Sequence, residues 1–203
     1  MKLLAFNDLH CDAGAAERLV RLSTEVDLVI GAGDYACMHD GLDETIAMLA
    51  SIATPTVLVP GNNETVADLR AALRIWPAAR ILHGATLEHD GFRIFGLGGV
   101  SGAKGGWSFT LSESEIAAAF APITEADIVI LHGPPRGVLD DPAGGLQGSP
   151  AVADAILRIE PALAFCGHVH ARWGREERLG LTRIVNGGPG GRIIEWERSS
   201  RPA

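Results

Sequence analysis

Short polar segments recur along this chain, and they contain residue types that bind metal ions. In chain order these segments are Asp8-Leu9-His10, Gly33-Asp34, Gly61-Asn62-Asn63-Glu64, Leu131-His132-Gly133 and Gly167-His168-Val169-His170. Each one lies at or just after the end of an apolar run. Their Asp, Asn and His side chains offer oxygen and nitrogen donors, which suit Mn²⁺, Fe or Zn²⁺. The pattern therefore predicts a hydrolase that uses two metal ions.

Two metal ions held in this way support the hydrolysis of phosphate esters. A carboxylate such as Asp34 can bridge two cations about 3.5–4 Å apart, which together acidify a water and hold the phosphoryl oxygens during in-line attack. Neutral His and Asn donors complete the two shells without adding negative charge. Considered alone, Asp8 could be a turn residue and His132 a core histidine with satisfied hydrogen bonds. The complete ordered set disfavours those interpretations.

The composition limits the alternatives. The chain has 203 residues, of which 47% are hydrophobic and 21% charged, and this predicts one globular domain over residues 1–203 with a substantial core. Its apolar stretches fall short of the roughly 20 residues that span a bilayer. The first apolar run leads directly into Asn7-Asp8, without the pattern of a signal peptide. We therefore expect a soluble, cytoplasmic protein with no membrane partner, and three sparse cysteines fit a reducing compartment.

The charge of the chain bears on its partners. A formal net charge of −8 argues against a stable nucleic-acid partner, because phosphate contacts need clustered Lys and Arg. A small phosphate ester remains allowed as substrate, since bound cations would reverse the sign of the field inside the site.

Alternating strands and helices must position the polar segments. The runs 2–6, 27–31 and 56–60 are rich in Leu, Val and Ile and are bounded by polar or turn residues, as buried strands are. Helical patterns follow, with Asp12 and Asp40 as expected N-caps and a third helix after Asn63. The candidate ligands then lie at strand ends on one edge of an open sheet, where α/β folds bind ligands.

The second half of the chain mixes strands and helices. His89-Asp90-Gly91 is a hairpin-type turn sequence, Ser112 to Glu115 forms a capping box, and Ser149-Pro150 begins a helix. The C-terminal segment 198–203 is expected to be a frayed tail. We expect strands at 80–82, 86–88, 92–97, 127–131, 162–166, 181–186 and 192–196.

Together the polar segments resemble the motifs of the calcineurin-like metallophosphoesterase superfamily, D-x-H, G-D, G-N-H-[DE], H and G-H-x-H. The resemblance extends from Asp8 to His170 and implies a four-layer α/β/β/α sandwich with two central mixed sheets. The segment 131–137 also resembles the H-G-P-P-x-G element of small, single-domain phosphodiesterase-like members. The resemblance implies that Asp8, His10, Asp34 and His170 hold a first divalent ion (Mn, Fe or Zn), and that Asp34, Asn62, His132 and His168 hold a second, with Asp34 as the bridge.

One position departs from the family pattern. Asn63 stands where the resemblance implies a histidine that protonates the leaving oxygen or stabilises the transition state. An amide donates hydrogen bonds but does not deliver a proton, and general acid catalysis contributes about 10²–10⁴-fold. We predict that Asn63 contacts the substrate and takes part weakly in catalysis; the alternative is that Asn63 is simply a helix N-cap. For Glu64 we favour a stabilising place in the first helical turn.

Two further residues are candidates for the site. His39 follows Asp34 by five residues and could replace the missing acid, and Arg136 could contact the substrate phosphate, although ordinary loop packing is the favoured interpretation of Arg136. The catalytic candidates are thus Asp34, Asn63 and His39.

The preferred hypothesis is a dinuclear metal-dependent phosphoesterase that hydrolyses phosphodiester bonds of a small substrate through a metal-bridging hydroxide. Activated substrates such as aryl phosphodiesters should react best, because their leaving groups need the least protonation. One alternative is a catalytically weak or inactive metal-binding scaffold of the same fold, which Asn63 favours and the intact ligand set opposes. A second alternative is a phosphomonoesterase.

Overall fold

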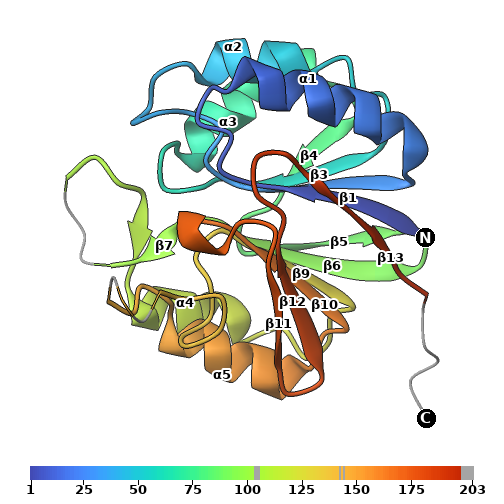
Figure 1. Cartoon of the computed structure of the whole chain (residues 1–203). Coiled ribbons are helices and arrows are strands. Elements are labelled where there is room, and N and C mark those ends of the chain that lie inside the picture. Colours follow the sequence, from blue (N-terminus) through green and yellow to red (C-terminus); the bar gives the residue numbers. More distant parts are fainter. Residues whose placement is uncertain (103–105, 142, 144, 198–203) are drawn as a thin grey trace.

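The computed structural model describes residues 1–102, 106–141, 143 and 145–197. Figure 1 shows two sheets that face each other, with helices on the outer face of each. The expected frayed tail, 198–203, lies outside the described residues. None of the described helices is both long enough and apolar enough to cross a membrane.

The ten strands that the sequence predicts are present, with each boundary within one residue of the prediction, and three further strands, numbered β7, β8 and β11 below, were not predicted. They are β1 (Lys2–Phe6), β2 (Leu28–Ala32), β3 (Thr56–Val59), β4 (Ala79–Ile81), β5 (Ala85–His89), β6 (Phe92–Leu97), β7 (Val100–Ser101), β8 (Thr110–Leu111), β9 (Ile128–Leu131), β10 (Leu163–Cys166), β11 (Glu176–Leu179), β12 (Thr182–Asn186) and β13 (Arg192–Glu195).

The helices occupy the expected places, although two of them begin differently. They are α1 (Ala13–Leu22), α2 (Leu42–Leu49), α3 (Val66–Ala72), α4 (Glu113–Phe120) and α5 (Pro150–Ile159), with short 3₁₀ turns η1 (Ser23–Glu25), η2 (Leu73–Ile75) and η3 (His170–Arg172). The N-cap of α2 is Gly41, with φ of 74°, so the prediction of an Asp40 cap was wrong. The N-cap of α3 is Thr65, which forms a capping box with Asp68, so Asn63 is not a helix cap.

Both large sheets are mixed, as the resemblance implied. The first has the strand order β13-β1-β2-β3-β4 and the second β11-β12-β10-β9-β6-β5. Strands β1 to β4 run parallel, and β13 joins β1 antiparallel. In the second sheet β6, β9, β10 and β12 run parallel, with antiparallel strands β5 and β11 at the edges. The parallel strands of each sheet therefore end along one edge.

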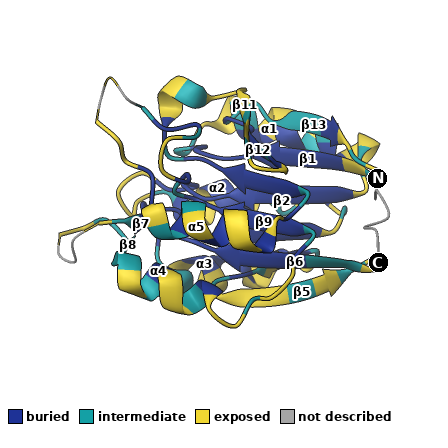
Figure 2. Cartoon of the chain, turned by 90° about the horizontal axis from the view of Figure 1, so that it is seen from below, coloured by how far each residue is buried: buried dark blue, intermediate teal, exposed yellow. Residues whose placement is uncertain are grey.

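Three apolar layers hold the sandwich together. One lies between α1–α3 and the first sheet, one between the two sheets, and one between the second sheet and α4 and α5. Figure 2 shows buried strands and helices whose outer surfaces are exposed. The four-layer α/β/β/α sandwich is confirmed. These layers include Leu19, Ile46 and Leu69 in the first, Leu3, Ile30 and Ile130 in the second, and Phe120 and Ile156 in the third.

Candidate metal centre

The predicted metal ligands meet where parallel strands of both sheets end. Because the parallel strands within each sheet point the same way, the loops that follow them gather at one end of the sandwich, the position expected for a ligand site. Asp8 and His10 follow β1, Asp34 follows β2, Asn62 follows β3, His132 follows β9, and His168 and His170 follow β10.

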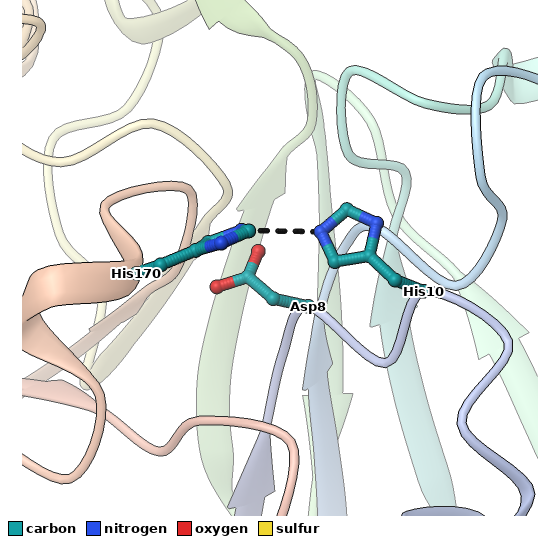
Figure 3. Close-up of side chains that lie close together, drawn as sticks. All are labelled: Asp8, His10 and His170. Carbon is teal, nitrogen blue, oxygen red and sulfur yellow. Dashed lines mark hydrogen bonds between the residues drawn. The ribbon is translucent and has the colours of Figure 1, made fainter.

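A first cluster contains Asp8, His10 and His170, whose ligand atoms lie within 4.8 Å of one another. His10 Nε2 and His170 Nε2 are 3.1 Å apart. Figure 3 shows the Asp8 carboxylate pointing toward the two imidazole rings. One oxygen and two nitrogen donors therefore converge from loops that are about 160 residues apart in sequence.

A second cluster contains Asp34, His132 and His168, again with ligand atoms within 4.8 Å of one another. The side-chain oxygen Oδ1 of Asn62 joins it, at 3.0 Å from His132 Nε2 and 3.0 Å from His168 Nδ1. All four residues that were expected to hold the second ion therefore lie together.

Asp34 lies between the two clusters. Its Oδ2 is 3.7 Å from His10 Nε2 in the first cluster, and its Oδ1 is 3.3 Å from His132 Nε2 in the second. The two oxygens of one carboxylate thus face different clusters, which is the geometry that a bridging ligand needs.

Backbone carbonyls orient two of the histidine rings. His10 Nδ1 lies 3.2 Å from the Ala36 oxygen, and His132 Nδ1 lies 2.8 Å from the Ala32 oxygen. When Nδ1–H donates to a carbonyl, Nε2 is left with a free electron pair that faces the cluster, as in metal-binding histidines. The oxygen and nitrogen donors fit divalent ions such as Mn²⁺, Fe²⁺ or Zn²⁺.

The buried charges of the site are coupled. Burial lowers the pKa of His132, but the Asp34 carboxylate outweighs burial and raises this pKa to about 9. Burial raises the pKa of Asp34, but the charge and hydrogen bond of His132 outweigh burial and hold it well below its usual range. Burial lowers the pKa of His168 to about 4, helped by the positive charge on His132. At neutral pH, His168 is therefore already in the neutral form that binds metals.

The loops that carry the ligands have unusual backbone conformations. Asp8, His10, Asp34 and His168 have positive φ of 55°, 44°, 60° and 66°, a region that residues other than glycine adopt rarely and that clusters at functional sites. A Cβ on Gly61 would lie 2.0 Å from Asp34 Oδ1 and 2.2 Å from the Asp34 backbone nitrogen. The glycine in this motif therefore allows the loops after β2 and β3 to touch.

Asn63 is buried beside Asp34. Its Nδ2 donates to Asp34 Oδ2 at 2.7 Å, and its Oδ1 accepts from the Met38 backbone nitrogen at 2.8 Å. The amide therefore links the Asp34 carboxylate to the loop that precedes α2. Its predicted contact with substrate stays a prediction.

His39 lies on the same loop as Asp34. Its backbone nitrogen donates to the backbone carbonyl oxygen of Asn63 at 2.9 Å. Its side-chain Nε2 lies 2.5 Å from the Trp107 carbonyl oxygen. This Nε2 would have to leave the Trp107 carbonyl before it could donate a proton to a leaving group.

Arg136 lies on the loop after β9. Its Nε donates to the Gly148 carbonyl at 2.7 Å, so part of its guanidinium stabilises the connection that leads into α5. A phosphate contact by Arg136 stays a prediction.

Glu64 has a structural role that the sequence prediction missed. It precedes α3 rather than lying in its first turn, so that expectation was wrong. The carboxylate is fully buried and accepts backbone hydrogen bonds from Asp34 and Gly61 at Oε1 and from Tyr35 and Ala36 at Oε2. A buried carboxylate so placed holds the loop that carries Asp34. The one signal in the sequence was an acidic residue directly after two candidate site residues.

Comparisons with known proteins support this fold. A family model described as metallophosphoesterase, calcineurin superfamily, matches residues 35–191. The segments that contain Asp8, His10 and Asp34 precede this range, and the fold brings them to the same site. No curated protein matches the sequence.

Several solved structures share the fold at low sequence identity. TT1561 of Thermus thermophilus has a TM-score of 0.75 and 20% identity, over 93% of this chain and 90% of that chain. A phosphopantetheinyl hydrolase from Mycobacterium tuberculosis has a TM-score of 0.67 and 16% identity, over 100% and 98%. A dimetal phosphatase from Danio rerio has a TM-score of 0.62 and 14% identity, over 92% and 86%.

The family model covers well over half of the chain and includes Asn62, His132, His168 and His170. The chain therefore belongs to the calcineurin superfamily of metallophosphoesterases, which are metal-dependent hydrolases of phosphoric esters.

Proposed function

We propose that this phosphoesterase uses two divalent metal ions and hydrolyses phosphodiester bonds of a small substrate. The observation that carries the proposal is the position of Asp34: one of its carboxylate oxygens faces the first donor cluster and the other faces the second. A single-metal site would need only one of these clusters. Two divalent ions bound here would supply an acidified water as nucleophile and neutralise charge that develops on the phosphoryl oxygens.

The chain's own residues prepare this site in several ways. Asp34 stays ionised because its pKa is held well below its usual range by His132, which outweighs the effect of burial. His10 and His132 keep their Nε2 atoms toward the clusters through the carbonyls of Ala36 and Ala32. The donors are thus set in place before substrate arrives, which limits the reorganisation needed during reaction.

The preference for diesters with good leaving groups rests on Asn63. Its amide is bound to Asp34 and Met38 and has no proton to give to a leaving oxygen. The lack of an acid at this position should cost about 10²–10⁴-fold for poor leaving groups and least for aryl esters. His39 is the proposed substitute acid, and an unchanged rate and pH profile in His39→Ala would exclude it.

The same observation favours a second candidate function, a metal-binding scaffold with little or no turnover. Asn63 could then serve only to hold Asp34 and the Met38 loop together. The complete set of donor residues favours the enzyme, since a scaffold has no chemical need for two clusters of metal ligands.

Turnover of a diester and a monoester separates these functions. We would measure hydrolysis of bis(p-nitrophenyl) phosphate and of p-nitrophenyl phosphate by metal-stripped protein to which Mn²⁺ is returned. The enzyme should be diester-selective and metal-dependent, and Asp34→Asn should abolish turnover. Asp154→Asn, an exposed substitution on α5, is the matched control and should behave as the unaltered protein. Absence of turnover in a protein that binds two metal ions would support the scaffold.

A further inference from the structure

Trp173 contacts two of the three donors of the first metal cluster. Its indole Nε1 donates to Asp8 Oδ2 at 2.8 Å, and its ring packs on the His170 imidazole with centroids 4.5 Å apart and planes inclined by 31°. No sequence motif pointed to this residue, which follows the Gly167-His168-Val169-His170 segment directly after η3.

The backbone around Trp173 fixes the position of its indole. Its nitrogen donates to the His170 carbonyl at 3.1 Å, which closes the η3 turn. A Cβ on Gly188 would lie 3.0 Å from Trp173 Cβ and 3.2 Å from its Cγ, so a glycine at that position makes room for the ring. Arg172 Nε donates to the Asp140 carbonyl at 2.9 Å and ties η3 to a second loop. These neighbours therefore hold the backbone that carries the indole in place.

The hydrogen bond from Trp173 affects which oxygen of Asp8 can bind a metal ion. Asp8 Oδ2 accepts from both Asn7 Nδ2, at 2.6 Å, and Trp173 Nε1. Asp8 Oδ1 accepts only from the His168 backbone nitrogen, at 3.1 Å, among the described residues. Each carboxylate oxygen has two lone-pair positions. The remaining open position is therefore on Oδ1.

The contact with the ring of His170 has a different effect. His10 and His132 are oriented by backbone carbonyls, whereas no hydrogen bond at Nδ1 of His170 occurs in the part of the chain that the structure describes. The Trp173 ring lies closer to this imidazole than the His10 ring does, with centroids 4.5 Å rather than 5.0 Å apart, and its plane is inclined by 31° rather than 60°. The Trp173 ring therefore restrains the plane of the His170 imidazole. It thereby keeps Nε2 of His170 turned toward His10.

We propose that Trp173 is a positioning residue of the first metal centre, which sets the affinity of that centre by orienting Asp8 and His170. The second cluster has no contact of this kind with Trp173 among the described residues. Removing a partner that orients a metal ligand typically weakens metal binding 10–100-fold. The effect should therefore fall on one of the two metal sites.

Mn²⁺ titration of metal-stripped protein, followed by calorimetry, tests this assignment without any substrate. Trp173→Phe keeps an aromatic ring against His170 but removes the N–H, and Trp173→Leu removes both contacts. We expect Trp173→Phe to weaken one Mn²⁺ site by about 10-fold or more and Trp173→Leu to weaken it further, with the other site unchanged. Trp196→Phe is the matched control, because Trp196 packs on Phe92 and touches neither cluster; it should leave both sites unchanged.

Tryptophan fluorescence gives a second readout. A paramagnetic ion held by His170 should quench the indole that packs on it, so Mn²⁺ should quench the unaltered protein and Trp196→Phe more than Trp173→Phe, which lacks this indole. The difference reports that the ion occupies the first centre, and the affinities report what Trp173 does for it. Unchanged affinity at both sites in Trp173→Phe, or equal weakening of both, would overturn the proposal. Either result could occur in an active diesterase, so failure here is distinct from failure of the proposed function.

Discussion

Asn63 occupies the position at which the resemblance of the sequence motifs implies a histidine, and its amide forms hydrogen bonds with Asp34 and Met38. Under the proposed function, an acid missing from this position matters most where the leaving group is a poor one. At this scale, single side chains decide which reactions are fast, because proton delivery and ligand orientation each depend on one or two atoms.

Restoring the histidine should broaden the substrate range. Asn63→His should raise turnover of an alkyl phosphate ester by about 10-fold or more, and turnover of an aryl diester much less, because only the poor leaving group needs an acid. Asn63→Ala is the control, since it removes both amide hydrogen bonds without adding an acid. Rates for leaving groups of graded pKa measure the effect. A uniform gain across leaving groups would argue against a missing acid.

Glu64 should matter for stability. Each of its carboxylate oxygens accepts two backbone N–H groups, so Glu64→Gln must lose two of these bonds in either orientation of the amide. We expect a loss of roughly 3 kcal/mol in the free energy of unfolding. Denaturant unfolding of the metal-stripped protein measures it. The exposed Glu17→Gln on α1 should change stability by about 0.5 kcal/mol or less, and a similarly small change in Glu64→Gln would contradict the assigned role.

The pair of Asp34 and His132 predicts a pH dependence of metal binding. Burial lowers the pKa of His132, but Asp34 outweighs burial and raises this pKa to about 9. Below that pH the imidazole carries a second proton and is cationic, whereas a metal-bound histidine is neutral. Binding of Mn²⁺ at pH 7 should therefore release a proton, and the apparent affinity should rise between pH 7 and pH 9. Calorimetric titration in buffers of different protonation enthalpy counts this proton. His89→Gln, on β5 at the far end of the second sheet, should leave the count unchanged. Binding without proton release would refute the assignment.

At the scale of elements, the turns after the strands set the spacing of the ligands. The loops after β2 and β3 touch through Gly61, where a Cβ would meet the backbone and carboxylate of Asp34. The segments that follow β1 and β10, two strands in different sheets, supply the three donors of the first cluster. The site therefore depends on how closely neighbouring loops approach as much as on the ligands themselves.

Gly61→Ala should separate these two loops. The added methyl group meets backbone atoms that cannot rotate away, so we expect a loss of about 1–3 kcal/mol in the free energy of unfolding and weaker binding of Mn²⁺ at the second cluster. Gly14→Ala is the control: it lies in the first turn of α1, where its Cβ would have ordinary contacts, and it should be neutral or stabilising by up to about 1 kcal/mol. Equal effects of the two substitutions would contradict the close packing of the loops.

Apolar patterning predicted these elements well because most strands are buried on both faces. Runs of Leu, Val and Ile marked the strands of both sheets, and Ser112 and Ser149 marked the starts of α4 and α5. Strand β11 was missed because its Glu176, Glu177 and Arg178 form an exposed edge with no apolar run. The N-cap of α2 was predicted wrongly because Gly41, in a left-handed conformation, occupies the N-cap position that was assigned to Asp40.

At the scale of the whole molecule, the sandwich brings distant segments to one edge. The sequence identified the residues of both clusters, because five segments in fixed order carry the resemblance. It did not identify Glu64 and Trp173 as partners of the ligands, because the contact of Glu64 with the Asp34 loop and that of Trp173 with Asp8 join residues that are 28 to 165 positions apart in sequence. Such contacts depend on how two sheets pack, which periodicity within one element does not encode.

The central claim is that the chain holds two metal ions with Asp34 between them. A crystal structure of the Mn²⁺-loaded protein, with anomalous scattering measured for manganese, tests it most directly. We predict two anomalous peaks about 3.5–4 Å apart, one beside Asp8, His10 and His170 and the other beside Asn62, His132 and His168, with one peak or none in Asp34→Asn. A single peak in the unaltered protein, or two peaks that Asp34 does not join, would contradict the dinuclear site.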